Sequence, residues 1–198
     1  LEAVQSIGEE ISSTQKPTYR SSAIFPVQHN KTFTSKIIFM GYWLLKRNIK
    51  EIGILYTLRN ETGKILSRKN SVVDSHKAYS ISLEEFADKL TENFVGSLEL
   101  EIFSTRDLVF PYPAFVLVYY SDKFSSVVHT VGRIYNDIED LTGNEEYVVR
   151  ESGFDIYGNP NLQSFLALTN GPQENKNPTF SYELNTKSGE IFIGNFNL

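Results

Sequence analysis

The chain has 198 residues, of which 40% are hydrophobic and 13% aromatic, and it contains no cysteine. A chain of this size buries roughly 70% of the surface that it exposes when unfolded, so it can form a packed core without cross-links. The absence of cysteine excludes disulfides, thiolate nucleophiles and cysteine-ligated metal sites. The net charge of -5 argues against a general nucleic-acid binder, because such proteins usually carry a basic surface.

The chain has no sequence typical of a membrane span. Its longest apolar run, residues 37–45, is about half of the ~20 residues that a spanning helix needs. The first residue is Leu1 rather than Met. One interpretation is that a secretory signal has been cleaved off; the others are cleavage by a different protease and a chain that was prepared from this residue onward. The first interpretation predicts a secreted or cell-surface protein.

Two kinds of segment open the chain. Residues 1–20 are polar, with Leu1, Val4, Ile7 and Ile11 at near-helical spacing, which predicts a leader or a short amphipathic segment. Short strands begin afterwards, at residues 23–27 and then at 36–46. The second run is apolar nearly throughout, which is typical of a strand covered on both faces.

A β-hairpin is predicted from residues 52–59 and 64–68, which flank the sequence Asn60-Glu61-Thr62-Gly63. Glycine at the last loop position adopts a positive φ without a clash of a Cβ atom, which closes a hairpin through a type I turn and a bulge.

One short helix is predicted at residues 83–91. Ser82 and Glu85 have the spacing of a capping box, in which each side chain binds a backbone N–H of the other's turn. Leu83, Phe86 and Leu90 fall on one face of this helix.

Further strands and a linker complete the predicted organisation. Residues 97–102 alternate strictly, which predicts a strand with one buried and one exposed face. Residues 114–120 form another apolar run, and residues 125–135 are rich in strand-forming side chains. We therefore expect a β-sandwich domain over 21–136, an acidic linker over 137–147 and a second, incomplete β unit over 148–198. Strands of that last unit are predicted near residues 147–157, 163–168, 179–184 and 190–196.

The chain also contains a candidate internal repeat. Tyr56, Leu58, Gly63 and Ile65 match Tyr182, Leu184, Gly189 and Ile191 without a gap at an offset of 126 residues. Duplication of a β unit is one explanation. Convergence between two similar hairpins is the other.

Catalytic patterns are absent from the sequence. No G-x-S-x-G elbow, P-loop or dinucleotide motif occurs, and none of His29, His76 and His129 lies beside a serine in a recognisable pattern. Glu99 and Glu101 share one face of a strand, as a carboxylate pair in a glycosidase would, but an exposed polar stripe is the interpretation that we favour. No catalytic residue and no cofactor are predicted.

The acidic linker is the one candidate metal site. Asp137, Glu139 and Asp140 supply carboxylate oxygens of the kind that calcium prefers, although the spacing does not fit an EF-hand. A solvated linker is the alternative, and it explains the same composition.

Two surfaces are candidates for binding. Residues 35–69 carry eight bases and two acids, so Lys46, Arg47 and Lys50 are candidate interface residues for contact with an acidic surface of another subunit. Tyr42, Trp43 and Tyr112 are candidates for a flat platform that stacks on sugar rings, with core packing as the alternative.

Together these patterns predict a mainly β protein, an antiparallel β-sandwich of the immunoglobulin-like or jelly-roll-like kind with one short helix and a partial second unit. The predicted function is a non-catalytic structural or binding module, a subunit or repeat of a surface or filament assembly. The alternative is a carbohydrate-binding module or an accessory domain of a carbohydrate-active enzyme. Protein partners, including other copies of the chain, are expected, and nucleic acid is not.

Overall fold

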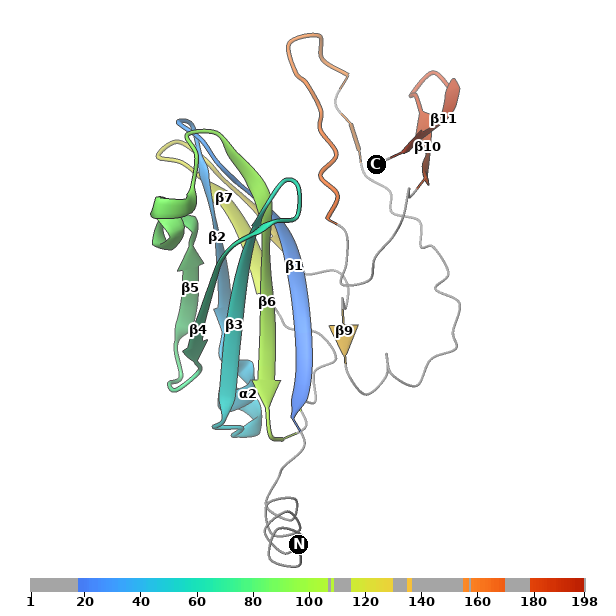
Figure 1. Cartoon of the computed structure of the whole chain (residues 1–198). Coiled ribbons are helices and arrows are strands. Elements are labelled where there is room, and N and C mark those ends of the chain that lie inside the picture. Colours follow the sequence, from blue (N-terminus) through green and yellow to red (C-terminus); the bar gives the residue numbers. More distant parts are fainter. Residues whose placement is uncertain are drawn as a thin grey trace, which may run out of the picture.

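The computed structural model describes residues 18–106, 108, 115–129, 135–136, 155–156, 158–169 and 179–197. Within these ranges, two antiparallel sheets pack as a sandwich, and a separate β-hairpin stands apart from it near the C-terminal end (Figure 1). The prediction of a mainly β fold built as an antiparallel sandwich is confirmed.

The first sheet has the strand order β4-β3-β6-β1-β9, and all of its pairings are antiparallel. β6 is its central strand and pairs with β1 along its whole length. The strands are β1 (Tyr19–His29), β3 (Ile52–Asn60), β4 (Ile65–Val72), β6 (Phe94–Ser104) and β9 (Tyr135–Asn136).

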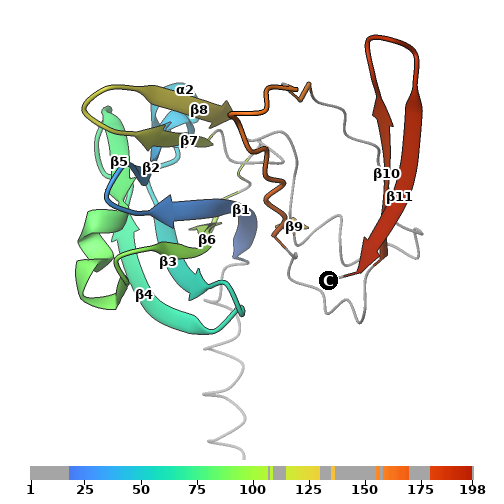
Figure 2. The ribbon, with the colours of Figure 1, turned by 90° about the horizontal axis from the view of Figure 1, so that it is seen from above.

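The second sheet has the order β5-β2-β7-β8 and is also antiparallel. Its strands are β2 (Thr34–Met40), β5 (Ala78–Ser82), β7 (Phe115–Tyr120) and β8 (Ser125–His129). Seen from above, the two sheets form two layers, with β1, β3 and β6 facing β2 and β7 (Figure 2).

Apolar side chains from both layers fill the space between the sheets. Leu98, Leu100 and Ile102 point into it from β6, and each is at most 1% exposed. Phe115 of β7 meets Phe39 of β2 edge-to-face, with ring centroids 4.8 Å apart. Edge-to-face rings place the positive edge of one on the negative face of the other, which stabilises the pair beyond its buried area.

The strand predicted at residues 36–46 is wrong in its second half. β2 ends at Met40, and after Gly41 the chain turns into the short helix α2 (Tyr42–Arg47). A Cβ atom at Gly41 would lie 2.7 Å from the side chain of Val73, so glycine permits this close turn. The apolar run is continuous because both the strand and the first turn of the helix face the core, and apolarity alone does not separate the two.

The predicted β3–β4 hairpin is confirmed. Gly63 has φ +81°, and the register shifts by one residue between Leu58 and Arg59, as a bulge requires. The Asn60 side chain oxygen accepts the backbone N–H groups of Thr62 and Lys64, which fixes the turn.

The capping box at Ser82 is also confirmed, but the helix that follows is a 3₁₀ helix. In η1 (Leu83–Lys89) the Ser82 hydroxyl accepts the N–H of Glu84, and the Glu85 carboxylate accepts the N–H of Ser82 at 3.0 Å. Leu83 and Phe86 are fully buried. The winding is interrupted at Phe86, whose φ of -116° is not helical, so η1 consists of two short pieces joined at a kink.

The C-terminal part matches the predictions incompletely. β10 (Thr179–Asn185) and β11 (Ile191–Asn197) form the predicted hairpin, and its residues pair only with each other among the described strands. Residues 163–168 are described but form no strand. Of the leader predicted over residues 1–20, residues 1–17 lie outside the described residues, and β1 begins inside it at Tyr19. The acidic linker predicted over 137–147 also lies outside the described residues.

Candidate functional site

A charged cluster lies on the face of the first sheet that points away from the second sheet. Alternation along β6 sends Leu98 and Leu100 into the core and sends Glu99 and Glu101 to the opposite face. Register brings β1 to one side of these carboxylates and β3 to the other. Arg20, Arg59, Glu99 and Glu101 are called the outer-face cluster below.

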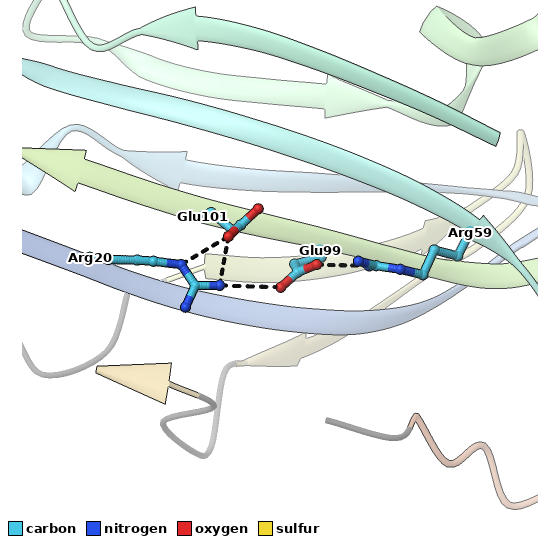
Figure 3. Close-up of polar contacts among 4 residues, drawn as sticks. All are labelled: Arg20, Arg59, Glu99 and Glu101. Atoms are coloured by element: carbon cyan, nitrogen blue, oxygen red, sulfur yellow. Dashed lines mark hydrogen bonds and ion pairs between the residues drawn. The ribbon is translucent and has the colours of Figure 1, made fainter. Parts of the chain in front are cut away.

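The four side chains form one chain of ion pairs across three strands (Figure 3). Arg20 donates from Nε and Nη2 to Glu101 Oε1 at 2.8 and 2.6 Å. Its Nη2 also lies 3.8 Å from Glu99 Oε1, and Arg59 Nη1 lies 2.7 Å from Glu99 Oε2. Glu99 therefore lies between two guanidinium groups, one from each neighbouring strand.

The outer-face cluster is sheltered from water although it lies on an outer face. The Glu99 side chain is 5% exposed, and the side chains of Glu101, Arg20 and Arg59 are 12%, 19% and 23% exposed. An ion pair with so little solvent around it is screened weakly, so its geometry matters more to stability than that of a surface pair.

Two buried hydroxyls flank the cluster. Ser22 is opposite Glu101 in the β1–β6 register, and Thr57 is opposite Glu99 in the β3–β6 register. Both residues are 0% exposed, and neither hydroxyl oxygen has a hydrogen-bond partner among the described residues. A buried hydroxyl without a partner costs on the order of 1–3 kcal/mol in lost solvation.

The favoured interpretation of Glu99 and Glu101 as an exposed stripe is wrong. The predicted alternation along the strand is present, but Arg20 and Arg59, which come from distant parts of the chain, cover the carboxylates. No sequence pattern links them, since Arg20 and Glu101 are 81 positions apart. The cluster holds two positive and two negative groups, which suits cross-linking of β1, β6 and β3 better than proton transfer to a substrate.

The predicted aromatic platform is divided by the fold. Trp43 is 3% exposed and packs on Phe39 and Phe115, with ring centroids 6.4 and 6.3 Å away. Tyr42 is half-buried, and the ammonium group of Lys46 lies 4.7 Å from the centre of its ring. Tyr112 lies outside the described residues. Trp43 thus occupies the core, which leaves Tyr42 as the one described member of the platform at the surface.

The predicted interface residues Lys46, Arg47 and Lys50 are all exposed, at the end of α2 and just after it. Lys46 and Arg47 occupy the last turn of the helix, where positive charge interacts favourably with the carbonyl end of the helix. This exposure agrees with a binding surface and equally with a solvated helix end.

Other candidates for chemistry are dispersed. His76 and His129 are exposed, and His29 Nδ1 lies 2.9 Å from the Thr34 hydroxyl oxygen. Hydrogen bonding from Ser75 holds the pKa of the exposed Asp74 carboxyl below its usual value. Within the described part of the chain, no three histidine or carboxylate side chains gather as metal ligands would. The calcium candidates Asp137, Glu139 and Asp140 lie outside that part.

The β10–β11 hairpin presents a second candidate surface, which the sequence reasoning missed. Register places six residues on one face of it, called the aromatic face below: Phe180, Tyr182, Leu184, Phe192, Gly194 and Phe196. The Phe180 and Phe196 rings are stacked, with centroids 5.3 Å apart. Tyr182 and Phe192 are 50% and 53% exposed. The alternating apolar residues were a sufficient signal for strands, but not for whether anything covers them.

The turn of this hairpin repeats the turn of β3–β4. In one, the N–H of Gly63 binds the carbonyl of Asn60 at 3.0 Å; in the other, the N–H of Gly189 binds the carbonyl of Thr186 at 3.0 Å. Both glycines have positive φ, +81° and +88°. The β3–β4 bulge has no counterpart in β10–β11, so the likeness is close at the turn and ends beyond it. Duplication of a whole unit stays a prediction.

None of the described helices is long and apolar enough to cross a membrane. Comparison with protein families, with curated proteins and with solved structures finds no match for this chain.

Proposed function

We propose that this protein is a non-catalytic structural module that associates with other copies of itself through the aromatic face of the β10–β11 hairpin. The observation that carries the proposal is this uncovered face, with Tyr182, Leu184 and Phe192 each at least 40% exposed. Large apolar patches at the surface mark sites of interaction.

The hairpin supports association for a second reason. A two-stranded hairpin in water is marginally stable at best, and it needs a further layer against its apolar face. In the sandwich, the matching face of the β3–β4 hairpin has that layer, since Ile54, Tyr56 and Leu58 are buried in the core. Burial of the aromatic face would stabilise β10–β11 in the same way.

A second copy is the occupant that fits the aromatic face best. None of its six residues carries a charge. Two such faces related by a twofold axis meet without repulsion, as an isologous interface requires. A strongly charged partner would lose solvation there without gaining an ion pair.

The carbohydrate-binding alternative has weaker support. It relied on a flat aromatic platform, and Trp43 lies in the core with its ring against Phe39 and Phe115. The outer-face cluster is engaged internally, so its carboxylates are not presented to a sugar.

Molar mass measured by light scattering over a range of concentrations tests the proposal. We expect the mass to rise with concentration, and Phe192→Ser to shift that rise to concentrations roughly tenfold or more higher. Ile193→Ser is the matched control, because Ile193 is 75% exposed on the opposite face of the same strand. A wild-type chain that keeps a single-chain mass at every concentration overturns the proposal.

A further inference from the structure

Several stretches at the edges of the two sheets are protected against pairing with another strand. The first is the part of β1 beyond Ser22, with which the two-residue strand β9 does not pair. Pro26 has no N–H, and its carbonyl accepts the Tyr119 hydroxyl at 2.7 Å. The Ser35 hydroxyl accepts the Gln28 N–H at 2.9 Å and donates to the Gln28 carbonyl at 2.8 Å. At Pro26 and Gln28, the backbone groups that an added strand would need are therefore occupied or missing.

The β4 edge is protected by η1 and by charge, whereas β5 carries no charged residue and is protected by η1 alone. η1 packs against both strands, and Lys69 of β4 donates to the backbone carbonyl of Glu85 in η1. The Lys69 ammonium also lies 4.5 Å from the centre of the Phe86 ring. Arg68 and Lys69 are exposed on β4, and lysine or arginine on an edge strand opposes pairing.

The β8 edge has none of these devices. Its residues 125–128 include no charge and no proline, and no described strand pairs with its outer side. Val127 is 65% exposed and Val128 is 46% exposed. Val128 is opposite the fully buried Leu117 and so lies on the core side of its sheet. The core layer thus ends at β7, and β8 extends beyond it with an apolar side chain uncovered on each face.

A segment of the same chain has the complementary character. Residues 161–169 read Asn-Leu-Gln-Ser-Phe-Leu-Ala-Leu-Thr, without charge, proline or glycine. Leu162, Phe165, Leu166 and Leu168 are all exposed, Phe165 at 79%. The segment is described without strand structure, although its pattern predicts a strand. Among the described residues, one chain therefore contains both a segment with a strand pattern but no strand pairing and, at residues 125–128, a strand edge with no further strand paired to it.

We propose that residues 162–168 of one copy add as a strand to the β8 edge of a second copy. This inference rests on the proposed self-association and specifies a second contact for it. Main-chain hydrogen bonds would extend the second sheet, and the leucine side chains would cover Val128 on its core side. The two surfaces are different, so the contact is head-to-tail and leads to chains of molecules rather than closed pairs.

Two matched variants test the pairing. Val127→Lys places a positive charge on the β8 edge, and Val72→Lys places the same charge on β4, where Val72 is 61% exposed. We expect Val127→Lys to restrict the largest assemblies seen by sedimentation velocity to species of two chains, and Val72→Lys to leave the distribution unchanged. An assembly that responds equally to both, or to neither, overturns the inference while leaving the proposed function intact.

A peptide separates the edge contact from the hairpin contact. A fluorescently labelled peptide of residues 161–169 should bind the Phe192→Ser chain, and Val127→Lys in that background should weaken binding roughly tenfold or more. Absence of binding overturns the pairing even where the wild-type chain associates. Leu166→Pro tests whether the segment instead pairs with the β8 edge of its own chain. A lower melting temperature with an unchanged molar mass would indicate such pairing within one chain, and it would also overturn the inference.

Discussion

The Tyr119 hydroxyl donates a hydrogen bond to the carbonyl oxygen of Pro26 over 2.7 Å, joining the two sheets across 93 positions of sequence. Tyr119 lies on β7, next to the sheet edge at β8, and Pro26 lies toward the C-terminal end of β1. This bond and the pair that Ser35 makes with Gln28 fasten β1 to the second sheet. The part of β1 that β9 does not pair is thus closed by side chains from the second sheet.

Removing this bond should destabilise the sandwich measurably. Tyr119→Phe deletes the hydroxyl and leaves the ring in place, and the half-buried Pro26 carbonyl then lacks its donor. We expect a loss of about 1 kcal/mol in the free energy of unfolding, measured by urea denaturation. Tyr120→Phe is the control on the same strand, with its ring beneath Lys36. Equal effects of the two substitutions would contradict the assigned role of the Tyr119 hydroxyl.

The outer-face cluster should contribute more to the free energy of unfolding than an exposed ion pair of similar length. Glu99→Ala leaves Arg20 and Arg59 without their shared carboxylate in a sheltered site, so we expect a loss of about 3 kcal/mol. Glu92→Ala breaks the exposed pair with Lys31, whose atoms are 2.6 Å apart, and should cost less than about 1 kcal/mol. Denaturation of both variants at low and high salt checks the ranking. A Glu99→Ala chain as stable as Glu92→Ala would show the cluster to be well solvated.

The buried hydroxyl at Thr57 should be replaceable without loss. Thr57→Val keeps the shape of the side chain and removes an oxygen for which the described structure shows no hydrogen-bond partner. We expect the free energy of unfolding to stay the same or rise by up to about 1 kcal/mol. Thermal and urea unfolding of the variant measure it, with Thr57→Ser as the variant that retains the oxygen. A clear loss on Thr57→Val would mean that the hydroxyl binds a buried water molecule.

Stability should fall at alkaline pH because of Tyr56. Burial, with a further contribution from the nearby Glu85 carboxylate, raises the pKa of Tyr56 to about 12. An unfolded tyrosine has a pKa of about 10, so above that pH the unfolded chain loses its proton first and is favoured. The stabilisation that Tyr56 contributes is complete below about pH 10 and is lost as the pH rises toward 12.

Urea denaturation between pH 9 and 12 measures this loss. Tyr56→Phe should flatten the alkaline decline, although it also removes the contact between the Tyr56 hydroxyl and Ser71 and so lowers stability at neutral pH. The alkaline loss of stability that remains in that variant is due in part to Tyr119, because burial also raises the pKa of Tyr119. An unchanged slope in Tyr56→Phe would contradict the assignment.

Much of the architecture could be predicted because the signals are local. The β3–β4 hairpin follows from the conformational freedom of Gly63 at φ +81°, and the capping box follows from Ser82 and Glu85. The hairpin at the C-terminal end follows from alternation and a turn glycine in the same way. Each depends on groups fewer than six positions apart, so the chemistry is visible in the sequence.

The errors share one physical cause, which is that burial depends on distant residues. The apolar run across residues 36–46 contains a strand and a helix turn because both face the same core. Residues 163–168 have a strand pattern but no strand, since a strand needs a partner and none lies beside them in the described structure. Trp43 is an aromatic residue of the kind that forms a binding platform, but the fold buries it in the core.

By itself, the sequence determined the class of fold, the positions of its tightest turns and the absence of cysteine chemistry. Those properties depend on neighbouring residues or on composition alone. Only the tertiary structure decided that Glu99 is enclosed by Arg20 and Arg59, that Tyr119 binds the Pro26 carbonyl, and that Val127 and Val128 of β8 and the aromatic face are exposed. Each of these depends on which strands become neighbours, and long-range packing sets that order.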